Sequence, residues 1–282
     1  MINPQHQWAI QIDVTDACPR RCSNCTRFIG HRERKFFMPV EQFAEAAEAL
    51  KDFPTASPPV SAELRKFTGG RKVVGILGGE PLLHPEFAEL AAILEHTVPS
   101  RENRGLWTGL QWQNTPHAAV IERVFGYVNN NRHDHECLHS PILVALADVV
   151  PSLEDRKKLI DDCWLQRLWS STINPKGFWF CEVAGAMSIL FDGPDGLPVE
   201  PECWRRPLAD FQYQIDFACH RCGVPLNLQG RQDFENMDDV SQSNLDALTA
   251  ISSPRVREGR FVLREKTAED MDVTEAPWRY LQ

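Results

Sequence analysis

Residues 8–25 decide the fold and read Trp-Ala-Ile-Gln-Ile-Asp-Val-Thr-Asp-Ala-Cys-Pro-Arg-Arg-Cys-Ser-Asn-Cys. Apolar and polar side chains alternate over residues 8–14, which predicts a β-strand that runs into a loop. The cysteines of that loop are Cys18, Cys22 and Cys25. Three thiolates spaced CxxxCxxC can hold three corners of a [4Fe–4S] cluster, which usually takes four cysteine ligands. The next cysteine is Cys137, so one iron would keep an open position; the alternative is a structural zinc site.

Composition limits the class of protein. The chain has 282 residues, of which 43% are hydrophobic and 24% charged, with a net charge of -9. These values fit one large α/β domain or about two domains, and they exclude collagen, coiled coil and wholesale disorder. The acidic balance argues against a general nucleic-acid binder. We expect a cytoplasmic protein without a membrane partner, because no apolar run reaches about 18 residues and the start lacks a secretory pattern.

Two basic patches interrupt the acidic sequence. The first consists of Arg20, Arg21, Arg27, Arg32, Arg34 and Lys35, and the second of Arg255, Arg257, Arg260, Arg264 and Lys266. They predict local sites for anionic ligands, with solvated surface as the alternative.

A second motif, Gly78-Gly79-Glu80-Pro81, follows residues 72–77, which read as another strand. Residues 38–53 lie between the two motifs and carry an apolar stripe with the period of a helix. With this order of motifs, the chain resembles the radical S-adenosylmethionine (radical SAM) enzymes. In that family the cysteine triad holds the cluster, and the Gly-Gly-Glu-Pro turn meets the methionine amino group of SAM.

The resemblance implies an α/β fold, a partial TIM-like (β/α) barrel with its active site at the carboxyl ends of the strands. It implies that the enzyme reductively cleaves SAM to a 5′-deoxyadenosyl radical, which abstracts a substrate hydrogen for an isomerisation or tailoring reaction. The electron would come from a donor such as flavodoxin or ferredoxin. We expect Gly78 and Gly79 to allow positive φ and close backbone approach in a turn that cradles a ligand, and Glu80 to accept from the ammonium. Asn24 replaces the aromatic residue that the family often has there, which leaves the adenine contact in doubt.

Alternating patterns continue the predicted βα units. We expect helices at 84–96 and 117–125, strands at 105–112 and 142–150, and an insertion loop at 55–62. These elements belong to a radical SAM core over residues 1–150.

The second half contains another cysteine set. Ser152 and Asp155 form a capping-box-like start of a helix that we expect to carry Cys163. The set of four thiolates would be Cys163, Cys181, Cys219 and Cys222, with Cys137 and Cys203 in reserve. This half resembles the auxiliary-cluster (SPASM or twitch) region of radical SAM enzymes, and we place it at 151–230. The alternatives to a second [4Fe–4S] cluster are zinc and unliganded thiols. Residues 231–282 are expected to be a peripheral extension.

The substrate is the least determined part. Some small radical SAM enzymes resemble isomerases that rearrange an amino acid attached to a pyrimidine nucleoside of modified phage DNA, and others act on peptides or sugars. We therefore expect a small-molecule, nucleotide or DNA-borne substrate; the competing class is a non-catalytic iron–sulfur or zinc module. Residues 132–139, which are rich in histidine, are expected to belong to a polar pocket or, alternatively, to bind metal.

Overall fold

The computed structural model describes residues 1–131, 137–168 and 171–265. Its centre is a six-stranded sheet with the order β4-β3-β2-β1-β6-β7. The strands are β1 Ala9–Asp13, β2 Val73–Leu77, β3 Arg104–Thr108, β4 Tyr127–Asn130, β6 Ser171–Asn174 and β7 Gly177–Trp179. Neighbouring strands are parallel except β6 and β7, which form an antiparallel pair. Two small sheets join β5 Leu138–His139 to β8 Arg231–Gln232 and β9 Asp238–Val240 to β10 Phe261–Leu263.

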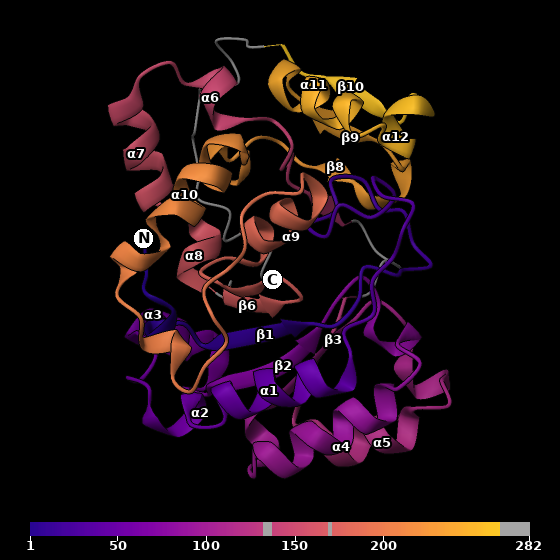
Figure 1. Ribbon diagram of the computed structural model, residues 1–282, viewed down its shortest axis with the longest axis vertical. Helices are drawn as coiled ribbons and strands as arrows, with labels where there is room; N and C mark the ends of the chain where they lie inside the picture. Colours follow the sequence, from indigo (N-terminus) through magenta and orange to yellow (C-terminus); the bar gives the residue numbers. More distant parts are fainter. Residues whose placement is uncertain (132–136, 169–170, 266–282) are drawn as a thin grey trace.

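Helices cover both faces of the sheet. They are α1 Val40–Leu50, α2 Phe53–Ala56, α3 Ala62–Thr68, α4 Phe87–Thr97, α5 Ala118–Val124, α6 Leu146–Val149, α7 Leu153–Asp161, α8 Trp164–Leu168, α9 Glu182–Leu190, α10 Gln212–Ala218, α11 Gln242–Ala250 and α12 Pro254–Arg257. In Figure 1, α1, α4 and α5 lie on one side of the sheet, and α8, α9 and α10 lie on the other. Within the described ranges, none of the helices combines the length and the apolar character that crossing a bilayer requires.

The two faces of β1 differ in chemistry. Ile10 and Ile12 belong to the main hydrophobic core. Gln11 and Asp13 alternate with them, so they point to the opposite face, as the period of a strand requires. Both polar side chains are buried, and both line cavities on that face. The sheet therefore places its site on the side away from α1.

The expected α/β architecture is confirmed, but the expected barrel is not. The sheet of the described residues is open, and β6 pairs with β1 instead of continuing beyond β4. Residues 142–150 are also not a strand: residues 146–149 form α6, and β4 takes the place beside β3. A short apolar run is equally compatible with a buried strand and with other buried backbone, and periodicity alone does not separate them.

Other expectations are met or corrected locally. The helix expected after Ser152 is α7, and the Ser152 hydroxyl accepts from Asp155 N at 3.2 Å. Cys163 lies beyond the end of α7, not on it.

The expected loop at 55–62 is bounded by two short helices, α2 and α3. Strands β6 and β7 were not expected, and they bring part of residues 151–230 into the central sheet; the division into three regions stays a prediction.

Candidate functional site

The two sequence motifs meet at one cavity. Its volume is about 410 Å³, and the thiols of Cys18, Cys22 and Cys25 lie in its lining. Gly78, Gly79 and Glu80 line the same cavity, and Pro81 starts the short 3-10 helix that follows. Parallel pairing of β1 with β2 explains this, because both motifs follow the carboxyl ends of neighbouring strands.

The Gly-Gly-Glu turn packs directly on the backbone of the cysteine loop. Gly79 N donates to Thr15 O at 2.6 Å, and Glu80 N donates to Ala17 O at 2.8 Å. A Cβ atom on Gly78 would lie 2.7 Å from Thr15 O, and one on Gly79 would lie 2.5 Å from Ala17 O. Neither glycine has a positive φ, so that expectation was wrong. The expected close backbone approach is present, and the backbone approached is that of the cysteine loop.

Replacing Gly79 by alanine tests this packing. The added Cβ would force the turn and the cysteine loop apart, and we expect unfolding free energy to fall by about 1–3 kcal/mol. Gly109→Ala is the matched control, because its Cβ would meet nothing closer than Arg20 Nε at 3.5 Å. Urea unfolding measures both variants. Equal stabilities of the two would contradict the packing argument.

Glu80 joins the ends of β2 and β3. Its buried carboxylate accepts from Thr108 Oγ1 at 2.8 Å, Gly109 N at 2.9 Å and Leu82 N at 3.2 Å. Burial raises the pKa of Glu80 above its usual value, and these hydrogen bonds oppose the shift. The structure therefore gives Glu80 a structural role, and its expected contact with an ammonium stays a prediction.

The triad thiols have the chemistry of metal ligands held in a desolvated loop. Burial raises the pKa of Cys18 to about 11 and that of Cys22 to about 12. Such thiols are protonated at neutral pH, and a bound metal must displace their protons. Among the described residues, no group of three or more His, Cys, Asp or Glu side chains is arranged to hold a metal ion as it stands. Three sulfur donors facing an open cavity fit a cluster with one free corner.

The second cysteine set also converges. Cys163, Cys181, Cys219 and Cys222 line one small cavity of about 20 Å³, whose other walls are mainly apolar. Burial raises the pKa of Cys181 to about 12, and it raises the pKa of Cys219 and Cys222 strongly. The four cysteines thus share one cavity and are the donor types of a zinc or cluster site, although their side chains are not arranged as metal ligands as they stand.

The two cavities are neighbours. Leu165 and Val224 line both of them, so these two apolar residues form a wall between the cysteine sets. The reserve cysteines lie elsewhere: Cys137 lines the large cavity, and Cys203 is buried outside the linings of both.

Asn24 and a C-terminal segment hold the cysteine loop. Asn24 has a φ of 49°, a left-handed conformation that asparagine tolerates. Its backbone N donates to Asp238 Oδ1 at 2.6 Å, and its side-chain amide bonds with Asp239. The departure from an aromatic residue at position 24 therefore has a structural cause.

Asp238 is the centre of this contact. Its Oδ2 lies 2.7 Å from Arg255 Nε and 2.9 Å from His31 Nε2. Arg255 is buried and donates to the carbonyl oxygens of Cys22 and Ile29. Within the expected extension, Asp238, Asp239 and Arg255 are thus buried and contact the cysteine loop. Sequence reasoning missed this contact, since two adjacent aspartates in an acidic stretch carry no signal of burial.

Five arginines of the two basic patches form ion pairs with the chain's own carboxylates. The pairs are Arg21–Glu258, Arg27–Asp13, Arg27–Glu182, Arg255–Asp238, Arg257–Glu33 and Arg264–Asp239. Lys266 lies outside the described residues. Because a carboxylate of the chain already pairs with each of these five arginines, they are not free to bind an anionic ligand as the sequence predicted.

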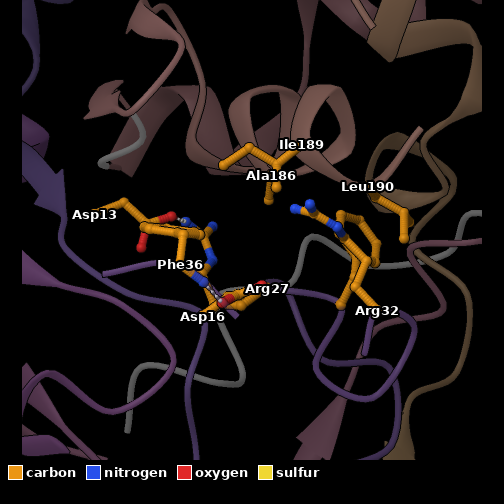
Figure 2. Close-up of a pocket in the computed structure, with 9 residues that line it drawn as sticks. Asp13, Asp16, Arg27, Arg32, Phe36, Ala186, Ile189 and Leu190 are labelled. Carbon is orange, nitrogen blue, oxygen red and sulfur yellow. Dashed lines mark hydrogen bonds and ion pairs between the residues drawn. The ribbon is translucent and has the colours of Figure 1, made fainter. Parts of the chain in front are cut away.

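Arg27 lies between the large cavity and a smaller one. Figure 2 shows Asp13 and Arg27 on one side of this smaller cavity, with Ala186 and Leu190 of α9 above. Arg27 Nη1 lies 3.3 Å from Asp13 Oδ2, and Nη2 lies 3.5 Å from Glu182 Oε2. One buried cation therefore joins β1, the cysteine loop and α9.

Asp13 makes this arrangement pH-dependent. Burial raises its pKa from 3.8 to about 6, although Arg27 opposes the shift. The folded state then binds the proton more tightly than the unfolded state, so this group's stabilisation is lost as pH rises from about 4 to about 6. Asp13→Asn removes that loss, and we expect it to gain about 2 kcal/mol relative to wild type between pH ~4.5 and ~7.5. Urea unfolding at both pH values measures the difference; a pH-independent difference would contradict it.

The histidine-rich segment is only partly described. Residues 132–136 lie outside the described residues, so the metal alternative for this segment stays a prediction. His139 lines the large cavity, and its Nδ1 lies 2.7 Å from Ser23 O. Trp107 and Gln11 also line this cavity, and sequence reasoning did not select either.

Comparison with known proteins adds little to this site. No model of a known protein family matches the chain, and no curated protein matches it. One solved structure, described as "Crystal structure of BtrN in complex with AdoMet and 2-DOIA", is similar with a TM-score of 0.40 and 14% sequence identity. The match covers 77% of this chain and 92% of that chain. A likeness of this size assigns neither a fold nor a function, which must be argued from the residues themselves.

Proposed function

We propose that this chain is a radical SAM enzyme. Cys18, Cys22 and Cys25 would hold a [4Fe–4S] cluster, and the turn at 78–81 would hold the methionine end of SAM. The observation that carries the proposal is that both motifs line one cavity of about 410 Å³ and are joined by backbone hydrogen bonds. That volume lies within the range of small-molecule sites.

When bound, the cluster and SAM together supply one-electron cleavage of the sulfonium as the source of a hydrogen-abstracting radical. The chain's own part is placement and exclusion of water. Glu80 fixes the turn through Thr108 and Gly109. Leu165 and Val224 contribute apolar surface to the cavity wall, and such surface would help to keep a substrate radical from water.

The reaction we propose is an isomerisation or tailoring of a small-molecule, nucleotide or DNA-borne substrate, with an amino-acid-modified thymidine of phage DNA as the first candidate. A peptide or a sugar is the alternative substrate. An electron donor such as flavodoxin or ferredoxin would reduce the cluster. The competing function is a non-catalytic iron–sulfur or zinc module.

One assay separates the enzyme from the binding module. The protein is reconstituted anaerobically with iron and sulfide, and then incubated with SAM and dithionite. We expect 5′-deoxyadenosine and methionine to form in equal amounts. A loaded cluster that yields no 5′-deoxyadenosine above the protein-free control would favour the binding module.

The second cysteine set is proposed as a closed metal site for an auxiliary cluster, with zinc as the alternative. Its four thiols in one enclosed cavity support this. The measurement is the metal content of a variant in which Cys18, Cys22 and Cys25 are all alanine. About four irons per chain would support a second cube; one zinc would support the alternative, and no metal would reject both.

A further inference from the structure

Gln11 carries a buried amide that the fold leaves without a hydrogen bond. Its side chain lies on β1, is 1% exposed, and lines the large cavity. Neither Nε2 nor Oε1 has a hydrogen-bond partner among the described residues. A buried amide in this state lowers the stability of the folded protein. The contacts within the folded chain therefore give no reason for a buried amide at position 11.

Gln214 is the comparison, because it is a buried glutamine whose side-chain amide is hydrogen-bonded within the fold. It is fully buried, and its Oε1 accepts from Phe180 N at 3.1 Å. Its Nε2 donates to Phe178 O at 3.0 Å. The contrast suggests that Gln11 is retained for a ligand.

An aromatic surface lies beside Gln11 in the sheet. Gln11 pairs with Gly75 on β2, and Gly75 pairs with Gly105 on β3. A Cβ on Gly75 would lie 2.2 Å from Trp107 Cζ3, and one on Gly105 would lie 2.8 Å from the same atom. The Trp107 indole therefore covers the two glycines, next to the position of Gln11. The cavity wall combines a flat ring with an amide that offers one donor and one acceptor.

We propose that Gln11 and Trp107 form a recognition subsite for a planar amide whose N–H and C=O lie side by side, the edge shared by pyrimidine bases and primary carboxamides. Gln11 Oε1 accepts from the ligand N–H, and Nε2 donates to the adjacent carbonyl oxygen, as amide side chains do with base edges. Trp107 packs against the flat face of the ligand. The inference rests on the proposed function, because it names the substrate class of the same cavity.

The first test compares the stabilities of Gln11→Leu and Gln214→Leu. Leucine has a similar size, so the proposal expects Gln11→Leu to melt at or above the wild-type temperature. Gln214→Leu removes the hydrogen bonds to Phe180 N and Phe178 O and should melt lower. A Gln11→Leu variant that melts as low as Gln214→Leu would overturn the proposal, since Gln11 would then have a structural role.

The second test measures binding by isothermal titration calorimetry. The anaerobically reconstituted protein is saturated with SAM, without reductant, and titrated with thymidine, 2-deoxyribose or N-acetylglycinamide. Thymidine or the primary carboxamide of N-acetylglycinamide should bind, and whichever binds more tightly identifies the source of the group. Gln11→Leu should weaken that binding by about tenfold or more. Equal affinity for deoxyribose, no binding of either amide, or no effect of Gln11→Leu would each overturn the proposal.

The radical SAM function and the Gln11–Trp107 subsite can each be rejected without rejecting the other. SAM cleavage by the wild-type preparation is measured in parallel with binding. Cleavage without Gln11-dependent amide binding rejects only the subsite. Gln11-dependent binding without cleavage rejects the radical SAM function and leaves the subsite standing.

Discussion

Cys22→Ala is expected to reduce the formation of 5′-deoxyadenosine from SAM to background, while the chain stays folded. Cys22 is partly exposed in the lining of the large cavity, so its loss removes a ligand without opening a hole in the core. Two thiolates of one loop do not retain a cluster that needs three. The measurements are 5′-deoxyadenosine after reconstitution, iron content, and circular dichroism.

Cys203→Ala is the matched control. Its thiol is buried outside the linings of both cavities. We expect a loss of about 1 kcal/mol of unfolding free energy from the small cavity left behind, with iron content and SAM cleavage per folded chain retained. Cleavage that survives Cys22→Ala, or that is lost equally in both variants, would show that the triad is wrongly assigned.

Much of the fold was predictable because its pattern is local. The strand at β1, the helix at α1 and the strand at β2 each carry a clear period over their own length. The neighbouring positions of the two motifs then follow from parallel pairing alone. The convergence of Cys163 and Cys181 with Cys219 and Cys222 was also inferred, from residue type.

The rest depends on contacts far apart in the sequence. That β6 pairs with β1 cannot be read from residues 171–174, because a short strand does not encode which edge it joins. Asp238 supports residues more than two hundred positions away, and nothing in its local sequence marks it as buried. For Gly79 the close backbone approach was predicted and the positive φ was wrong, because its neighbour, the carbonyl of Ala17, is set by a contact distant in the sequence.

Asp238→Ala is expected to have the largest effect on stability. The carboxylate lies against the buried guanidinium of Arg255, against His31, and against the backbone N of Asn24. Its removal leaves a buried cation without a counter-charge, which costs about 3–5 kcal/mol. The cysteine loop loses its support at the same time, so we also expect reconstituted iron to fall in the fraction that remains folded.

The control is Glu258→Ala, which removes the exposed ion pair with Arg21 between the same two segments. Both partners are in solvent, so the expected loss is below about 1 kcal/mol. Urea unfolding and iron content are measured for both variants. If Asp238→Ala lowered the unfolding free energy and the iron content no more than Glu258→Ala, residues 231–265 would contact the cysteine loop without stabilising it. A large loss of stability and of iron for Asp238→Ala alone would mean that residues 231–265 help to shape the triad, because Asp238 and Arg255 contact Asn24, His31 and the carbonyl oxygens of Cys22 and Ile29.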